Sequence, residues 1–209
     1  MGQAINLTTW KRREHYEHFR GYRQPFFSVC VDVDATRLWR RSKAAGGPPF
    51  FLTSLFLMLR AANATEAFRL RLRKRGVWRH DRVAVGPTLL RPDHTFAFAR
   101  IESSANLKRF IASGNKAMAE TAARKDLDPN PGEDDIVYHS SLPWLRFTSF
   151  TNAIDGGDSI PRIVFGKCEK QGRRFLMPMS VEVHHALVDG LDVARFTERF
   201  QDQLSEFRG

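Results

Sequence analysis

One apolar segment in the first third of the chain constrains the fold more than any other. Residues 50–63, FFLTSLFLMLRAAN, place apolar side chains on nearly every side of a helix. A helix with one apolar stripe can lie on a protein surface, but a helix that is apolar all round must be buried. We therefore expect this segment to be a helix packed against a sheet in a globular core.

Helix and strand patterns alternate along the rest of the chain. Besides 50–63, helices are predicted over 9–19, 35–44, about 103–124 and from about Asp192 to the C-terminus. Strands are predicted over 26–33, 68–75, 82–86, 94–101, 136–140, 145–150, 162–168 and 173–185, with an exposed loop at 125–135. A turn at Gln171-Gly172 joins the last two strands. Interleaved helices and strands predict an α/β fold with a mixed β-sheet.

Length and composition are those of one domain covering residues 1–209. Hydrophobic residues make up 42% of the chain, enough for a packed core. The two cysteines, Cys30 and Cys168, lack metal-binding spacing, so we expect free thiols and no structural metal. No apolar run has the length of a signal peptide core or of a membrane span. We therefore expect a cytoplasmic protein without a membrane partner.

The net charge of +10 raises the question of nucleic-acid binding, because a basic surface attracts phosphates. However, Lys and Arg are spread over the whole chain, and their densest runs, 10–15 and 69–82, lie in amphipathic or alternating segments. A basic chain that handles a small polyphosphate cofactor would carry the same charge. We expect no nucleic-acid partner.

Two adjacent histidines end the last predicted strand, in the sequence MSVEVHHALVDG of residues 179–190. Because alternate side chains of a strand point to opposite faces, His184 and His185 cannot share a face, and parity places His185 with Val181 and Val183. An imidazole that enters an apolar layer has its charged form disfavoured and can accept a proton near neutral pH. From the residues alone, a structural histidine and a catalytic base both remain open.

Asp189 follows four residues after His185, in a turn that leads into the last helix. In a hydrolase such an Asp would orient the histidine of a catalytic triad. That arrangement needs a nucleophile, and the chain has no GxSxG segment and no activated-cysteine motif. The pattern favours an Asp held by a distant Arg, which would make the end of the strand rigid.

Four segments together resemble chloramphenicol acetyltransferases of the trimeric type. They are WKRREHYEHF at 10–19, SSLPWLRFTSF at 140–150, the strands around IPRIVFGK and FLMPMSVEVHH, and VHHALVDG at 183–190. Their order and spacing match the family over essentially the whole chain. The HHxxxDG motif alone is shared with condensation domains, carnitine acyltransferases and dihydrolipoyl acyltransferases. The first two groups are far longer, and the third usually has Asp-His-Arg-x-x-Asp-Gly.

The resemblance implies a two-layer sandwich in which helices cover the mixed sheet, and it implies roles for single residues. His185 matches the general base, which takes the proton of a hydroxyl that attacks the thioester of acetyl-CoA. Ser140 matches the serine that stabilises the tetrahedral oxyanion. Asp189 and Arg12 match an ion pair that holds the turn. No acyl-enzyme forms in the family, in agreement with the missing nucleophile. Taken singly, Trp144 after Pro143 is more often a core residue than a ligand contact, but its occurrence with Ser140 and Arg12 in family order reverses that reading.

Six positions depart from the family pattern, mostly where the acceptor is expected. The departures are Glu182 for Gln, Leu191 for an aromatic residue, Asp192 for His, Phe19 for Tyr, Val164 for Thr and Cys168 for Tyr. Lys167, beside Cys168, is the expected contact to the cofactor. None of the departures falls on His185, Ser140, Arg12 or Asp189, so the resemblance leaves the acetyl-transfer residues complete.

The resemblance therefore implies an acetyl-CoA-dependent O-acetyltransferase that acts on chloramphenicol and confers resistance by capping a hydroxyl of the drug. Phe19, Phe27 and Phe98 are candidates for an apolar wall of the acceptor pocket, although with seventeen Phe in the chain at least one can be plain core. A homotrimer with sites between neighbouring subunits is expected. The alternatives are an acyltransferase for another small alcohol and a non-catalytic binding protein of the same fold.

Overall fold

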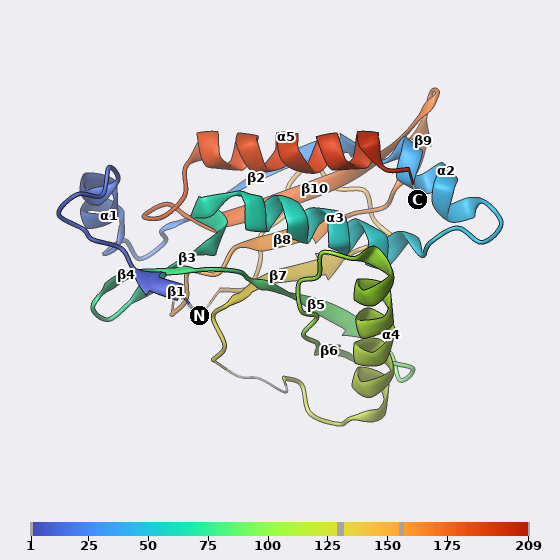
Figure 1. Ribbon diagram of the computed structural model, residues 1–209, viewed down its shortest axis with the longest axis horizontal. Coiled ribbons are helices and arrows are strands. Elements are labelled where there is room, and N and C mark those ends of the chain that lie inside the picture. The colour runs from blue at the N-terminus through green and yellow to red at the C-terminus, as the bar shows by residue number, and fades with distance from the viewer. Residues whose placement is uncertain (1, 129–131, 155–156, 209) are drawn as a thin grey trace.

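A computed structural model describes residues 2–128, 132–154 and 157–208 (Figure 1). The strands are β1 (Gly2–Ala4), β2 (Phe26–Asp34), β3 (Leu70–Arg73), β4 (Gly76–His80), β5 (Ala84–Leu90), β6 (Phe96–Phe98), β7 (Ile136–Ser141), β8 (Arg162–Phe165), β9 (Glu169–Gln171) and β10 (Arg174–His184). The helices are α1 (Arg13–Phe19), α2 (Thr36–Lys43), α3 (Phe50–Ala64), α4 (Leu107–Ala123) and α5 (Gly190–Glu206), with a 3-10 turn η1 (Glu66–Arg69).

The main sheet has seven strands. It is mixed, as the sequence predicts. Its order is β2-β10-β8-β7-β5-β6, with β9 pairing β10 beyond this path. Strands β5, β7 and β8 run parallel to one another, whereas β10 is antiparallel to both β2 and β8. Helices α3 and α5 lie along one face of the sheet (Figure 1), which confirms the α/β sandwich. A smaller sheet of order β1-β4-β3 flanks it.

The core lies between these two helices and the sheet. In α3 ten of the fifteen residues are buried, as its apolar sequence predicts. In α5 the residues at three- to four-residue spacing, Val193, Phe196, Phe200 and Leu204, are buried, and Phe200 stacks on Phe165 of β8. Burying aromatic rings of this size removes a large apolar area from water and is a main source of stability. No helix among the described residues is long and apolar enough to cross a membrane.

Two predicted helix starts are displaced in the structure by local hydrogen bonds. The first helix begins at Arg13 rather than Thr9, because Asn6 accepts the amides of Thr8 and Thr9 in a turn. Asn106 caps α4 by accepting the amide of Arg109, so this helix begins after the predicted serines. Side-chain oxygens of Asn often satisfy free amides at such positions.

The predicted strand over 145–150 is wrong. Strand β7 already has β5 on one side and β8 on the other, so this segment finds no free edge beside it. Instead Leu145 closes a turn by donating its amide to Leu142 and accepts the amide of Lys167. Farther along, Phe150 accepts a hydrogen bond from Ser28 of β2. The alternating pattern therefore forms an irregular segment tied to neighbouring strands by single hydrogen bonds.

Short strands and their turns account for the other differences. The predicted strand over 68–75 begins as η1 and turns back through β4, and neither β4 nor β1 was predicted. The strand over 94–101 is reduced to β6, and the strand over 162–168 ends at Phe165 as β8, with β9 beginning only at Glu169. The turn at Gln171-Gly172 is confirmed, with Gly172 at φ +58°. The predicted loop at 125–135 lies partly outside the described residues.

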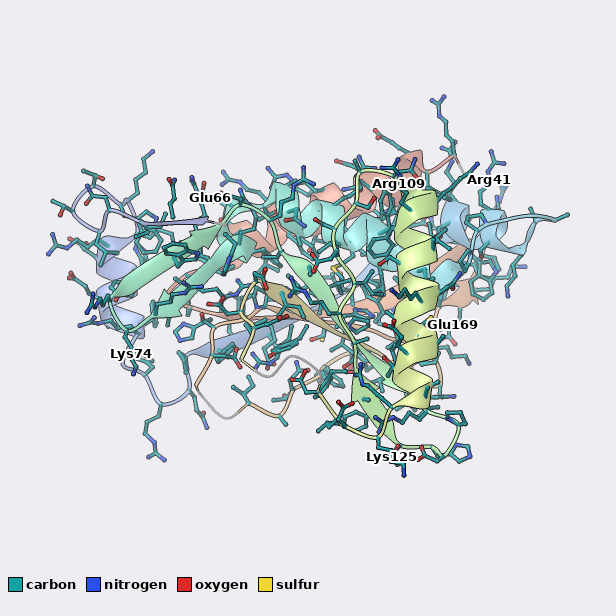
Figure 2. All side chains as sticks on the ribbon, turned by 60° about the horizontal axis from the view of Figure 1, so that its bottom comes forward. Arg41, Glu66, Lys74, Arg109, Lys125 and Glu169 are labelled. Carbon is teal, nitrogen blue, oxygen red and sulfur yellow. The ribbon has the colours of Figure 1, made fainter. Side chains whose placement is uncertain are left out.

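Basic side chains are distributed over several elements of the surface. Figure 2 shows Arg41, Lys74, Arg109 and Lys125 projecting from separate parts of the ribbon. All four are exposed. The positive charge in this view is spread over the molecule and is not concentrated on one element.

One arginine fastens the small sheet to the main sheet. Arg71 of β3 is fully buried and donates to four backbone carbonyls, those of Phe68, Leu70, Asp134 and Ile136. Burial lowers the pKa of Arg71 to about 10, so the guanidinium remains charged at neutral pH. A buried charge is tolerated only when its donors are satisfied in this way.

Replacing Arg71 by Met should therefore lower the free energy of unfolding by about 3 kcal/mol, since it leaves buried carbonyls without donors. The measurement is urea denaturation followed by circular dichroism. Arg75, exposed in the β3–β4 turn, supplies the matched control Arg75→Met, which should unfold as the native chain does. Equal unfolding free energies for the two variants would show that Arg71 does not carry this junction.

Candidate active site

The turn that follows β10 fixes the backbone of His185 on both sides. Its amide donates to the carbonyl of Pro25 at 2.8 Å, and its carbonyl accepts from Nη2 of Arg12 at 3.4 Å. The ring stacks flat on Phe19, with centroids 4.1 Å apart and planes at 9°, and also contacts Phe27 at 4.8 Å. Phe27 pairs with Val183 in the ladder, so His185 lies on the side that parity indicates. Two aromatic rings thus set the orientation of this imidazole.

His184 is the more buried of the pair, with 4% of its surface exposed. Its Nδ1 accepts the amide of Ala186 at 3.2 Å, and its ring meets Phe26 edge-on. Burial, with a smaller contribution from the charge of His185, lowers the pKa of His184 to about 4. At neutral pH His184 is an uncharged ring that accepts a hydrogen bond within the turn. Its geometry is that of a structural histidine.

Arg12 and Asp189 meet in the ion pair that the sequence predicts. Nη1 of Arg12 binds Oδ2 of Asp189 directly. The other carboxylate oxygen, Oδ1, accepts the amides of Leu191 at 3.0 Å and Asp192 at 3.2 Å, which makes Asp189 the N-cap of α5. Although partial burial opposes ionisation, the hydrogen bonds from Arg12 and these amides keep the pKa of Asp189 below its ordinary value. This carboxylate joins α1, the histidine turn and α5.

Ser140 stands in a different place, at the rim of a cavity of about 670 Å³. Its Oγ lies 3.1 Å from Oγ1 of Thr88. Phe98 lines the same cavity, so the three predicted wall residues divide into Phe19 and Phe27 beside His185 and Phe98 beside Ser140. Val164, the expected replacement for a Thr, pairs with Ser140 in the ladder and is buried. The hydroxyl of the expected Thr would therefore lie next to Ser140, where Val164 has none.

Strand directions hold Ser140 and His185 apart within one chain. Ser140 pairs with Val164, which pairs with Ser180 on β10. From Ser180 the chain continues five residues to His185, a distance of about 16 Å along the strand, with two strand spacings of about 5 Å across it. Strand β10 runs antiparallel to β7, so their carboxyl ends lie at opposite ends of the sheet (Figure 1). The two side chains therefore lie far apart within one chain.

The predicted cofactor contact Lys167 lies on the segment between β8 and β9. Its side chain is half exposed, with Nζ 3.3 Å from Oε2 of Glu169, and its amide donates to Leu145. Burial first, and then neighbouring carboxylates, raise the pKa of Cys168 to about 12. Both cysteines are free thiols, and Cys168 is protonated at neutral pH.

Charged side chains also lie at the cavity beside Ser140. The sequence did not predict most of them. Glu182, only 3% exposed, accepts a hydrogen bond from Nδ2 of Asn152 at 2.6 Å. Its ladder partner Arg162 is buried and binds Oδ2 of Asp158 at 2.6 Å. An Arg within the otherwise apolar strand RIVF was the signal for this cluster. Within the described part of the chain, no group of three or more potential ligands is placed to hold a metal ion.

Trp144 does not belong to the core of the single chain. Trp144 is 65% exposed, and its neighbour Leu145 is also exposed. Both lie in the irregular segment that follows β7 and Ser140. Large apolar side chains exposed together commonly mark a surface that contacts another molecule.

Comparisons with known proteins agree with this architecture. The family model described as chloramphenicol acetyltransferase matches residues 2–201. Chloramphenicol acetyltransferase 2 of Escherichia coli is 32% identical over 94% of both chains, and a chloramphenicol acetyltransferase of Streptomyces acrimycini is 32% identical over 97% of this chain and 94% of its own. A solved chloramphenicol acetyltransferase superposes with a TM-score of 0.87 at 28% identity, over 98% of this chain and all of the other.

A dihydrolipoamide acetyltransferase of Azotobacter vinelandii superposes with a TM-score of 0.70 at 21% identity, over 92% of this chain and 86% of its own, which shows a common fold. The match of the family model and the 32% identity over nearly whole chains go further. The chain belongs to the chloramphenicol acetyltransferase family. By this membership it is an enzyme, an acetyltransferase, and the predicted resemblance is confirmed.

Replacing Arg12 by Ala should destabilise the protein by about 2 kcal/mol at neutral pH, because Arg12 makes charge-assisted hydrogen bonds to the turn. The pKa of Asp189 is lowered in the folded state, so its contribution is present above the ordinary value of 3.8 and lost as pH falls through the lowered pKa. The stability difference between the native and Arg12→Ala chains should therefore shrink below about pH 4. Chemical denaturation at a series of pH values measures it.

Arg13→Ala is the control for this experiment, since Arg13 makes an exposed pair with Glu17 within α1. Such a pair contributes little to stability. If Arg12→Ala and Arg13→Ala unfold alike across the pH series, the ion pair does not hold the turn.

Proposed function

We propose that the protein is an acetyl-CoA-dependent O-acetyltransferase that acetylates a hydroxyl of chloramphenicol, with His185 as the general base. The observation that carries the proposal is the held imidazole of His185. Its backbone is fixed by Pro25 and Arg12, and its ring is held between Phe19 and Phe27. Nδ1 is buried without a hydrogen-bond partner, which leaves Nε2 as the ring nitrogen that faces a substrate.

In the proposed reaction Nε2 of His185 takes the proton of the acceptor hydroxyl, and the oxygen attacks the carbonyl carbon of the acetyl thioester. The carbonyl oxygen becomes an oxyanion in the tetrahedral intermediate. When the carbon–sulfur bond breaks, the CoA thiolate leaves and receives the proton from the imidazolium. The products are the acetyl ester and free CoA. No acyl-enzyme is required, in keeping with a protonated Cys168.

Ser140 is the proposed donor to the oxyanion. Its Oγ–H faces a cavity large enough for a small-molecule substrate, and Thr88 lies within hydrogen-bond distance to orient the hydroxyl. One positioned donor to a developing oxyanion is worth about 3 kcal/mol of the barrier. Lys167, half exposed beyond β8, is the proposed contact to the phosphate-bearing part of acetyl-CoA.

A homotrimer completes the site in this proposal, because Ser140 and His185 lie at opposite ends of the sheet. His185 of one subunit would face Ser140 of its neighbour. The exposed Trp144 and Leu145, next to Ser140 in the chain, provide apolar surface for such a contact. The cytoplasm is the proposed location, and it is supported by the two free cysteines.

A second candidate is an acyltransferase for another small alcohol. It is favoured by Arg162 and Asp158, which line the cavity beside Ser140 and give one wall a charged character. An acceptor richer in hydrogen-bonding groups than chloramphenicol would suit this wall. Turnover with a panel of alcohols, chloramphenicol first among them, distinguishes the two candidates.

Replacing His185 by Ala should lower kcat for CoA release with chloramphenicol by about 100-fold or more, the range associated with loss of a general base. Thiol release from acetyl-CoA measures the rate, and light scattering checks that assembly is unchanged. His94→Ala, in an exposed turn, is the matched control. Undiminished turnover in His185→Ala would remove His185 from the role of base.

Mixing two inactive variants tests whether the site is shared. In a trimer assembled at random from His185→Ala and Ser140→Ala chains, about a quarter of the interfaces join an intact His185 to an intact Ser140. Co-expression should therefore restore about a quarter of the native activity. Co-expression of His185→Ala with the double variant is the control and should restore none. Absence of recovery in hybrids shown to contain both chains would contradict a shared site.

A further inference from the structure

The start of α5 holds a second carboxylate that the ion pair between Arg12 and Asp189 does not require. Oδ2 of Asp192 accepts the backbone amide of Asp189 at 3.2 Å and lies 3.7 Å from Nη1 of Arg12. The amide of Asp192 in turn donates to Oδ1 of Asp189. The two residues thus form a reciprocal capping box at the N-terminus of α5.

We infer that Asp192 is a positioning residue for the proposed reaction, which holds the backbone of Asp189 and the guanidinium of Arg12 so that the His185 turn keeps one geometry. The inference rests on the proposed function. Asp192 occupies one of the positions that depart from the family pattern, and its side chain contributes to the same ion-pair network.

The path from Asp192 to the reacting ring is short and consists of direct contacts. Asp192 bonds the amide of Asp189, Asp189 binds Nη1 of Arg12, and Nη2 of Arg12 donates to the carbonyl of His185. Each of these contacts involves a backbone group or a planar charged group, so the side chains in the path have little rotational freedom. In this inference, loss of the Asp192 side chain displaces the backbone of His185.

Asp192 also interacts with the charges of Asp189 and Arg12. Burial and the neighbouring charge of Asp189 raise the pKa of Asp192, whereas Arg12 opposes this shift. Two carboxylates therefore share one guanidinium. Removing the side chain of Asp192 leaves Asp189 as the one carboxylate of this pair beside Arg12. It also leaves the backbone amide of Asp189 without its acceptor.

The test compares Asp192→Ala and Asp192→Asn with the same replacements at Asp202, which is exposed farther along α5. Asp192→Ala should lower kcat about 10-fold or more with KM for acetyl-CoA and chloramphenicol within about 2-fold, because a small displacement of a reacting group is costly in rate. Asp192→Asn keeps an oxygen for the amide of Asp189 and should remain within about 3-fold of the native kcat. Both Asp202 variants should match the native enzyme.

A second measurement does not depend on turnover. The ring Cε1–H resonance of His185, assigned by its loss in His185→Ala, should shift or broaden in Asp192→Ala and remain unchanged in Asp202→Ala. If the native enzyme acetylates no acceptor, the proposed function fails, but this comparison still decides whether Asp192 positions His185. An unchanged resonance in Asp192→Ala, an unchanged kcat, or a loss of kcat that Asn does not rescue would each overturn the inference.

Discussion

The contact between the Arg12 guanidinium and the turn after β10 is the interaction on which the site depends. It joins the beginning of α1, the end of strand β10 and the N-terminus of α5. Without it, the turn after β10 would lose its charged link to α1 and would be held by strand pairing and by uncharged hydrogen bonds such as that of the His185 amide to Pro25. A charged group at the junction of three elements is expensive to bury, and here its cost is offset by carboxylate and carbonyl partners.

The strand order of the main sheet constrains where His185 and Ser140 lie relative to each other. Because β10 and β7 are antiparallel, the residues that follow β10 and those at the end of β7 lie at opposite ends of the sheet. Under the proposed function, the cavity beside Ser140 and the ring of His185 are two half-sites on one chain. The proposed assembly joins them without any change in either half. The aromatic contacts of His185 and the hydroxyl contact of Ser140 are already formed in the separate chain.

Periodicity predicted the parts of this fold that are long and strongly patterned. The all-round apolar sequence identified α3, and the spacing of Phe196 and Phe200 identified α5. The pattern over 145–150 failed because strand formation also needs a free neighbour, which a local sequence does not reveal. Among the candidate residues, Arg12 and Asp189 were paired correctly from the resemblance. The pairing of Arg162 with Glu182 and the approach of Asp192 to Arg12 join segments far apart in the sequence, which local patterns do not reveal.

The two oxygens of Asp189 serve different partners, one capping α5 and the other binding Arg12. A side chain longer by one methylene would move at least one of these oxygens out of reach. Glutamate is therefore a poor substitute here in spite of its equal charge. Because the carboxylates of Asp189 and Asp192 share the guanidinium of Arg12, the three positions are energetically coupled. Among descendants of this sequence, changes at these three positions should be inherited together rather than drift independently.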